Sequence, residues 1–271
     1  MPDLTPKPYR IGLALSGGGA RGFAHVGALK ALEELNLKPD ILAGVSAGSV
    51  VAVLYSAGIP VNRIMKLFTN TKFRDLCEFM VKGGGFFKID RFRNIISKEI
   101  GSKYQNLEDL PIPVRIGVTD LDHGNKVQFS KGNISEIMGA SCSIPILFQP
   151  ITINGVRYVD GGVMSNMPGW TIRDDCELLI GVNCSPLPPQ GKLKNSLLEI
   201  GLRTYNLMLK GNVPEDMKLC DIAIEIPEIA SYKVFNLKEI QQVYIRGYVT
   251  TKQKVKEWLS QNQNNTTHSN D

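Results

Sequence analysis

A serine stands between two glycines in the stretch GVSAG at residues 44–48. The spacing Gly44-x-Ser46-x-Gly48 is typical of a nucleophile elbow, a sharp strand-to-helix turn that exposes a serine hydroxyl. An apolar run precedes Ser46 and another follows it, which fits that context. The alternative interpretation is a serine that only caps the next helix. A nucleophilic serine also needs a base, most often a histidine.

The chain contains three histidines, and none has the sequence context of a base. His25 lies about one turn into an expected helix, where local contacts would satisfy it. His123 stands in the turn-like stretch DLDHGN, where a polar residue needs no further explanation. His268 belongs to the polar tail QNQNNTTHSND, which we expect to be disordered and unable to hold a catalytic geometry.

Asp160 is the residue that we predict as the base. It follows Val159 at the end of an expected strand and precedes the pair Gly161-Gly162, which would let another backbone or a substrate approach. The alternative is a simple turn, because Asp-Gly favours turns. An aspartate is a weak base at its ordinary pKa of about 3.9. Partial burial away from positive charge would raise that pKa and make Asp160 a better base for Ser46.

The glycine-rich stretch GGGARG at 17–22 has two interpretations. It matches Gly-x-Gly-x-x-Gly, the fingerprint of a dinucleotide site, but the acidic residue required at the end of the second strand is missing, since Asp40 stands at its beginning. The other interpretation is an oxyanion hole, formed by the N–H groups of Gly17, Gly18 and Gly19 and reinforced by Arg21. A tight turn without a ligand is the simplest alternative.

The elements around these motifs alternate between strand and helix. Residues 10–15 and 41–45 read as buried strands, followed by helices over 20–35 and 47–58. This order predicts an α/β fold, a mainly parallel sheet with helices on its faces. Both motifs would then lie at the carboxyl ends of parallel strands, where sites form.

The remaining pattern extends this architecture. We expect further helices over 61–69, 90–100, 133–141, 194–210 and 236–258. Strands are expected over 113–120, 125–130, 178–183 and 220–225, and Asn154-Gly155 predicts a hairpin. Residues 76–92 are apolar, aromatic and glycine-rich, so they predict either a lid over a lipid site, hinged at Gly83–Gly85, or core packing.

Composition narrows the class of protein. The 271 residues are 43% hydrophobic and 21% charged, with a net charge of +5 spread along the chain, which does not indicate nucleic-acid binding and is compatible with contact with an anionic membrane surface. The five cysteines show no metal-ligand spacing, and no apolar run is long enough to cross a bilayer. We expect a cytoplasmic protein with one domain over 1–260 and a disordered tail over 261–271.

Four blocks in order, GGGARG at 17–22, GVSAGS at 44–49, ASCSIP at 140–145 and DGG at 160–162, resemble the patatin-like phospholipase family over about residues 9–185. The resemblance implies a three-layer α/β/α fold and a Ser–Asp dyad without histidine. It makes Ser46 the nucleophile and Asp160 the base, and the Gly17–Gly19 loop with Arg21 the oxyanion hole. It gives the ASCSIP block a supporting place beside the site.

The resemblance further implies hydrolysis of lipid acyl esters by a phospholipase, lysophospholipase or esterase, with no metal or cofactor. Two other functions stay open at this point. One is a non-catalytic or regulatory protein that binds acyl chains, and the other is a nucleotide-binding oxidoreductase. The sequence does not indicate chain length, head group, ester or thioester preference, oligomeric state or the role of residues 186–271.

Overall fold

A computed structural model describes residues 6–69, 71–79, 85–189 and 196–267 of the chain. The strands of the main sheet are β1 (Tyr9–Leu15), β2 (Ile41–Val45), β5 (Val114–Asp120), β6 (Asn125–Phe129), β8 (Ile151–Ile153), β9 (Val156–Asp160), β10 (Cys176–Asn183) and β11 (Ile222–Glu225). The longer helices are α1 (Phe23–Glu34), α2 (Ala47–Ser56), α3 (Val61–Phe68), α5 (Asp90–Ile100), α6 (Ile134–Ser141), α7 (Leu197–Met217) and α8 (Ile240–Thr267).

The main sheet is parallel at its centre and antiparallel at one side. Its strand order is β11-β10-β1-β2-β5-β9-β8, with β6 paired to β5. The pairs among β11, β10, β1, β2 and β5 are parallel, and β5 pairs antiparallel with both β6 and β9. The prediction of a mainly parallel α/β sheet is therefore confirmed.

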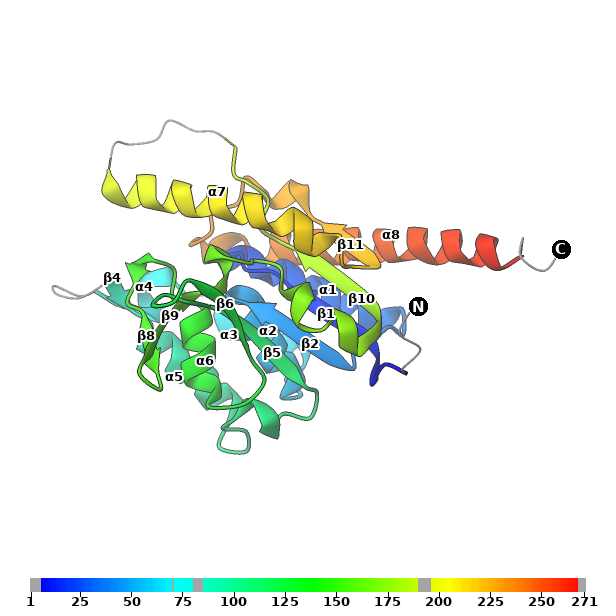
Figure 1. The fold of residues 1–271 in the computed structure, drawn as a ribbon. Helices are drawn as coiled ribbons and strands as arrows, with labels where there is room; N and C mark the ends of the chain where they lie inside the picture. The colour runs from blue at the N-terminus through cyan, green and yellow to red at the C-terminus, as the bar shows by residue number, and fades with distance from the viewer. Residues whose placement is uncertain (1–5, 70, 80–84, 190–195, 268–271) are drawn as a thin grey trace.

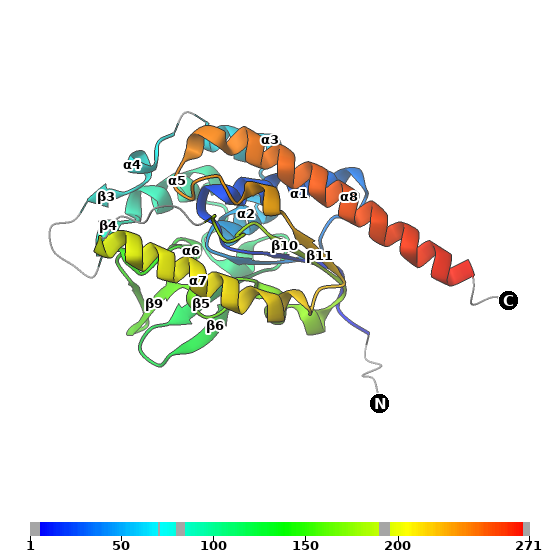
Figure 2. The same ribbon diagram turned by 90° about the horizontal axis from the view of Figure 1, so that it is seen from above.

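The two faces of the sheet pack against different layers, and Figures 1 and 2 show the helices on either side. Alternate residues of a strand point to opposite faces. Leu13 and Leu42 face the larger core with α1, α2 and α8, whereas Ala14 and Ala43 face a thinner core closed by α7. This arrangement is the predicted three-layer sandwich.

One edge of β5 serves two strands. Along it, β2 pairs in parallel with residues up to Gly117, where Val45 is its last partner. From Val118 onward, β9 pairs antiparallel, and its last residue Asp160 lies opposite Val118. Because β6 occupies the other edge over Ile116–Asp120, β2 and β9 must share one edge and meet end to end. The sheet therefore brings the residue after Val45 next to Asp160.

A second, smaller sheet was not predicted. It contains β3 (Glu78–Phe79), β4 (Gly85–Lys88) and β7 (Ile146–Phe148), with β4 parallel to β7. The short helix α4 (Phe73–Leu76) precedes it. Sequence patterns fail here because two of the strands have only two or three residues. Gly83 and Gly84 of the expected hinge lie outside the described residues.

The C-terminal region differs in extent from the prediction. Helix α7 continues to Met217 with Pro214 inside it, seven residues beyond the predicted end. Helix α8 reaches Thr267 and so includes most of the segment expected as a tail from 261, while 268–271 lie outside the described residues. In Figures 1 and 2, α8 lies beside α1 and then projects beyond the sheet. No helix in the described part of the chain could span a membrane.

Helices α1 and α8 cross at backbone contact, which leads to a test of stability. A Cβ atom added to Gly247 would lie 2.1 Å from the carbonyl oxygen of Ala24, so Gly247→Ala must push the helices apart. We expect a loss of about 1–3 kcal/mol in the free energy of unfolding, measured by urea denaturation. The control is Gly211→Ala in α7, where no atom lies within 4 Å of the added carbon. It should be neutral or stabilising by up to about 1 kcal/mol, and equal effects of the two changes would contradict this packing.

Candidate active site

Ser46 occupies a strained turn between β2 and α2. Its φ is 51° and its ψ is −123°, a region that residues other than glycine rarely adopt, at a cost of about 1–3 kcal/mol. The carbonyl oxygen of Ser46 accepts hydrogen bonds from the N–H (2.9 Å) and the hydroxyl (2.6 Å) of Ser49. A strained serine held between a strand and a helix has the conformation of a nucleophile elbow.

The elbow is also tied to the sheet through Ser141. The N–H of Ser46 donates to the Ser141 hydroxyl at 2.8 Å, and that hydroxyl donates to the carbonyl of Gly117 on β5 at 2.7 Å. The N–H of Asp160 donates to the carbonyl of Ser143 at 2.9 Å. The ASCSIP block thus holds both residues of the predicted dyad against the same strand.

The two elbow glycines are required by close packing. A Cβ atom on Gly44 would lie 2.5 Å from the backbone of Ser49, and one on Gly48 would lie 2.2 Å from the carbonyl oxygen of Leu15. A larger residue at either position would force α2 away from the sheet. The sequence pattern around Ser46 therefore reflects the tightness of the turn.

Asp160 ends β9 and begins a short 3-10 turn over Gly161–Val163. It is fully buried, and its Oδ1 accepts the N–H of Gly162 at 2.9 Å. Its Oδ2 accepts no hydrogen bond within the described residues. The hydroxyls of Ser46 and Tyr205 lie near enough to the carboxylate to affect its pKa.

Burial makes Asp160 a stronger base than an ordinary aspartate. Loss of water raises the pKa of its carboxyl to about 6, while the Ser46 hydroxyl, the Gly162 N–H and the Tyr205 hydroxyl act in the opposite direction. A carboxylate with this pKa is still charged at neutral pH, and it can accept a proton more readily than one in water.

The glycine loop supplies fewer free donors than predicted. The N–H of Gly17 is occupied by Asn166, whose carbonyl and side-chain oxygens lie at 3.3 and 3.2 Å. The N–H groups of Gly18 and Gly19 donate no hydrogen bond to any described residue. Gly19 and Ser46 line the same cavities. Gly18 and Gly19 can therefore offer donors to a developing oxyanion, whereas Gly17 positions the loop.

Arg21 binds backbone carbonyl groups from the later part of the chain. Its guanidinium donates to the carbonyls of Tyr232, Pro186 and Ala230, each at 2.8 Å. The side chain therefore holds the later part of the chain beside the glycine loop, while it also lines one cavity together with Gly19 and Ser46. The oxyanion-hole role of Arg21 stays a prediction. The sequence could not reveal these hydrogen bonds because the three acceptors are more than 160 residues away.

The two histidines in the described part of the chain, His25 and His123, pair with residues other than Ser46 and Asp160, and His268 lies outside the described residues. His25 is buried, with Nε2 at 2.8 Å from the carbonyl oxygen of Ser16, and burial lowers its pKa to about 4. His123 is exposed and pairs with Asp120 at 2.8 Å, which raises the pKa of the histidine. Asp160 is the carboxylate that the fold brings beside Ser46.

Two cavities meet at Ser46. One is almost entirely apolar and extends between α1, α2 and α3; its wall includes Phe23, Val51, Leu54, Ile64 and Phe68. The other lies toward α7 and carries polar groups, among them Ser185, Tyr205, Asn206 and Lys233. The arrangement can hold an apolar chain on one side of the serine and a polar group on the other.

Several residues of the site were not predicted. Ser141 and Asn166 stand in or after recognised blocks, but only the fold shows their hydrogen bonds. Asn212 on α7 donates to the carbonyl of Gly162 at 2.9 Å and accepts the N–H of Asn166 at 3.1 Å. Neither Asn212 nor Tyr205 belongs to a motif, so a single sequence gives no signal for them.

Comparison with known proteins identifies a family for the region that contains the four sequence blocks. The family model described as Patatin-like phospholipase matches residues 13–169. An NTE family protein of Mycobacterium tuberculosis is 31% identical over 185 residues, which are 66% of this chain and 51% of that protein. Lysophospholipase NTE1 of Cryptococcus neoformans is 30% identical over 178 residues, 61% of this chain and 10% of its own length. The chain thus spans about half or less of these relatives.

Two solved structures share the fold. VipD from Legionella pneumophila superposes with a TM-score of 0.59 at 16% identity, covering 93% of this chain and 67% of VipD. The type III effector protein ExoU gives a TM-score of 0.50 at 14% identity, covering 93% of this chain and 54% of ExoU. Both likenesses concern architecture alone.

The buried carboxylate of Asp160 should cost stability at neutral pH. Its pKa is raised from 3.8 to about 6 by folding, so between these values the folded protein binds more protons than the unfolded chain, and stability falls as pH rises. Above pH 6 the Asp160 carboxyl is charged in the folded protein, and its full cost to the free energy of unfolding applies. We expect Asp160→Asn to raise the free energy of unfolding by about 1–3 kcal/mol at pH 8, measured by urea denaturation.

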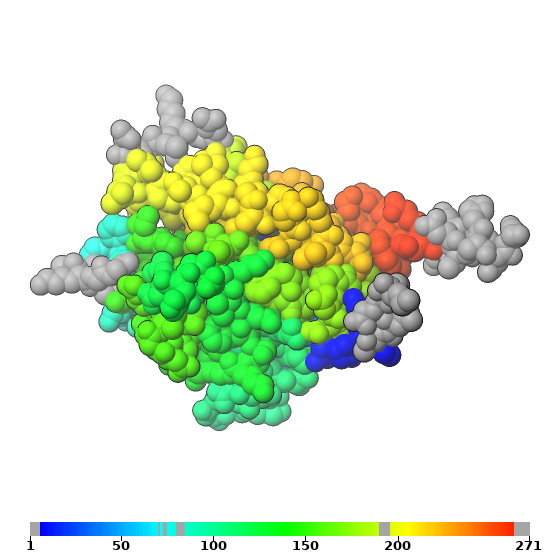
Figure 3. All heavy atoms as spheres, in the orientation of Figure 1, coloured from blue at the N-terminus to red at the C-terminus, as the bar shows by residue number. Residues whose placement is uncertain are grey.

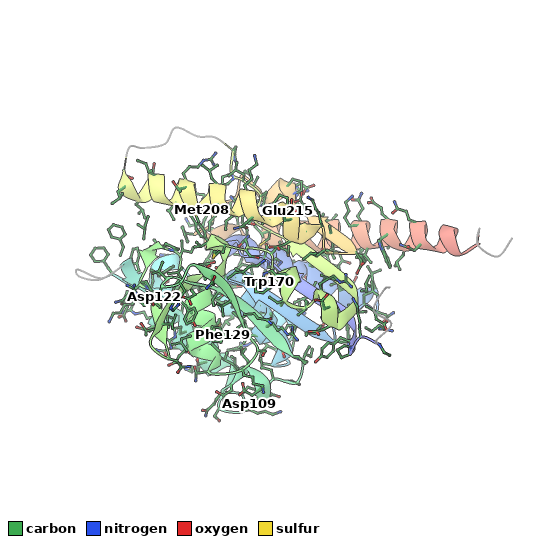
Figure 4. All side chains as sticks on the ribbon, viewed as in Figure 1. Asp109, Asp122, Phe129, Trp170, Met208 and Glu215 are labelled. Atoms are coloured by element: carbon green, nitrogen blue, oxygen red, sulfur yellow. The ribbon has the colours of Figure 1, made fainter. Side chains whose placement is uncertain are left out.

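The difference between the two proteins should shrink as pH approaches 4. The control is Asp122→Asn. Asp122 (labelled in Figure 4) pairs with Arg157 on the surface, and this pairing lowers the pKa of Asp122. That change should reduce stability slightly at pH 8. A destabilised Asp160→Asn protein at pH 8 would contradict the assigned pKa shift.

Proposed function

The chain belongs to the patatin-like phospholipase family, and from this membership we propose that it hydrolyses lipid acyl esters through Ser46 with Asp160 as the base. The observation that carries the proposal is the meeting of β2 and β9 along one edge of β5, which brings Ser46 beside a buried carboxylate of raised pKa. The chain spans only part of the length of its relatives, so we assign an activity to it as a proposal.

The proposed reaction has two halves. Asp160 accepts the proton of the Ser46 hydroxyl while Oγ attacks the acyl carbonyl, and the proton then passes to the departing alcohol oxygen. The resulting acyl-enzyme is attacked by water, from which Asp160 takes a proton that returns to Ser46 as the fatty acid leaves. The steps use only groups of this chain and water.

Backbone donors support the charged intermediate. The N–H groups of Gly18 and Gly19 lack acceptors among the described residues and lie on the loop beside Ser46. The short helix that begins at Gly19 adds the positive end of its dipole. Donors fixed in place before the reaction contribute about 2.7–4 kcal/mol each to such a transition state.

The two cavities fit the two parts of an acyl ester. The apolar cavity fits the fatty chain, and the polar cavity fits the alcohol part of the ester, since it contains hydroxyl, amide and ammonium groups. Apolar side chains such as Leu202, Leu209 and Phe235 also line this cavity, so the cavity alone does not exclude a second fatty chain. The relatives named lysophospholipase agree with a single-chain phospholipid as substrate.

A fluorophosphonate probe tests the nucleophile. We expect wild-type protein to be labelled on Ser46, as found by peptide mass spectrometry, and Ser46→Ala to remain unlabelled. Hydrolysis of a lysophospholipid should fall more than about 10³-fold in Ser46→Ala and at least about 10²-fold in Asp160→Asn. The control is Ser185→Ala, which removes a hydroxyl from the polar cavity and should retain labelling. A folded wild-type protein that is neither labelled nor active would contradict the proposal and favour an acyl-binding role.

We also propose peripheral contact with a membrane through an apolar rim, formed by Phe79, Phe86, Ile146, Leu197 and Ile200. These side chains are 38–74% exposed. They come from neighbouring elements, because β4 pairs with β7 and a Cβ atom on Gly201 would lie 2.4 Å from Ile146 Cδ1. An exposed apolar patch of this kind is suited to a lipid surface.

Segment 76–92 contributes to both the rim and the apolar cavity. Phe79 lies on the rim, whereas Leu76, Ile89 and Phe92 line the cavity. The lid function predicted for this segment is compatible with the positions of these side chains, and we keep it as part of the proposal. Deletion of 79–87, with activity measured on a long-chain ester, addresses it directly.

A rim that binds membranes should affect the hydrolysis of esters in vesicles and not that of dissolved esters. We expect Phe79→Ser combined with Leu197→Ser to reduce sedimentation with phospholipid vesicles and to slow hydrolysis of a long-chain ester in those vesicles several-fold. Hydrolysis of a dissolved short-chain ester should be unchanged. The matched control is Ile245→Ser with Val249→Ser, two residues of α8 that are 47% and 50% exposed. Equal loss of vesicle binding in both double variants would contradict a specific role of the rim.

A further inference from the structure

Helix α7 presents one face to the turn that contains Asp160. Tyr205, Leu209 and Asn212 are spaced four and three residues apart, so they lie on the same side of the helix. Asn212 holds the carbonyl of Gly162. A Cβ atom on Gly162 would lie 2.7 Å from Leu209 Cδ2 and 2.5 Å from the hydroxyl of Tyr205. In Figure 3 this helix, in yellow, lies along the upper side of the molecule.

The hydroxyl of Tyr205 is thereby brought to the carboxylate. Gly162, against which it packs, donates its N–H to Oδ1 of Asp160. The other oxygen, Oδ2, is buried and has no hydrogen-bond donor in the described part of the chain. A buried carboxylate oxygen without a donor is unfavourable, and a neighbouring phenol can supply one by a small rotation.

Tyr205 also remains a donor over a wide pH range. Burial and the nearby charge of Asp160 raise the pKa of the phenol well above its ordinary value, so it stays neutral and protonated. In turn, the hydroxyl lowers the pKa of the Asp160 carboxyl. Tyr205 is half-buried and lines the same cavity as Ser46.

We propose that Tyr205 is a positioning residue that donates a hydrogen bond to Oδ2 of Asp160 and so holds the carboxylate charged and oriented toward Ser46. The inference rests on the proposed function, since it assigns Asp160 as the base. It adds a third side chain to the site, from a part of the chain outside residues 13–169, over which the family model matches.

The test is the pH profile of Tyr205→Phe. Asp160 must be charged to accept a proton, so kcat/KM of the wild type should rise through pH 6. Loss of the phenol removes an influence that lowers the pKa of Asp160. The rise should therefore move to higher pH by roughly half to one unit, while kcat/KM at pH 9 stays within about threefold. The control is Tyr248→Phe on α8, which removes a phenol that donates to Glu34 at 2.6 Å, away from both cavities beside Ser46, and should leave the profile in place.

A second measurement separates this inference from the proposed function. In protein labelled with ¹³C at aspartate carboxyls, the Asp160 resonance is identified by its absence in Asp160→Asn. Its midpoint should move to higher pH in Tyr205→Phe, whether or not any ester is hydrolysed. An unchanged midpoint, or an equal loss of kcat/KM at every pH, would overturn the role of Tyr205 and leave the Ser46–Asp160 proposal standing. If the wild type is neither labelled nor active, but the midpoint moves in Tyr205→Phe, the proposed activity is rejected and the contact between Tyr205 and Asp160 is retained.

Discussion

The candidate site depends on one edge of β5, where β2 and β9 arrive from opposite directions and end at adjacent residues. Because strand side chains alternate between faces, a shift of either strand by one residue would turn Ser46 or Asp160 away from the other. Three contacts fix the register. The Ser141 hydroxyl joins Ser46 to Gly117, the carbonyl of Ser143 accepts the N–H of Asp160, and Gly161 packs against Gly117. The ASCSIP block therefore aligns Ser46 with Asp160.

This geometry also explains how a carboxylate can stand where a histidine is more usual. Burial at the junction of the strands removes water from Asp160 and raises its pKa, and no cation among the described residues contributes to that pKa. Arg21, the cation of the glycine loop, is bound to three carbonyls elsewhere. A guanidinium beside Asp160 would lower its pKa and weaken the base. We expect the same burial to make the folded protein less stable at neutral pH, a cost met at many functional sites.

The parts of the fold that could be predicted from the sequence are those fixed by local pattern. The strands before the glycine loop and before Ser46 are largely apolar runs, and Asn154-Gly155 marks its hairpin by turn chemistry. The small sheet of β3, β4 and β7 could not be predicted because β4 and β7 are far apart in the sequence and the strands are very short. The same limit applies to Arg21, Tyr205 and Asn212. Their partners are chosen by topology, which a single sequence does not display.

Residues of the last third of the chain hold and surround the candidate site. Asn212 holds the turn after Asp160, Arg21 binds carbonyls of residues 186, 230 and 232, and α8 packs along α1 at Gly27 and Gly247. Val234 and Phe235 line both cavities beside Ser46. A boundary near residue 185 would therefore cut through the walls of the site. We therefore propose one domain over 1–260, in which the motifs would supply the reacting groups and the later helices would determine what can reach them.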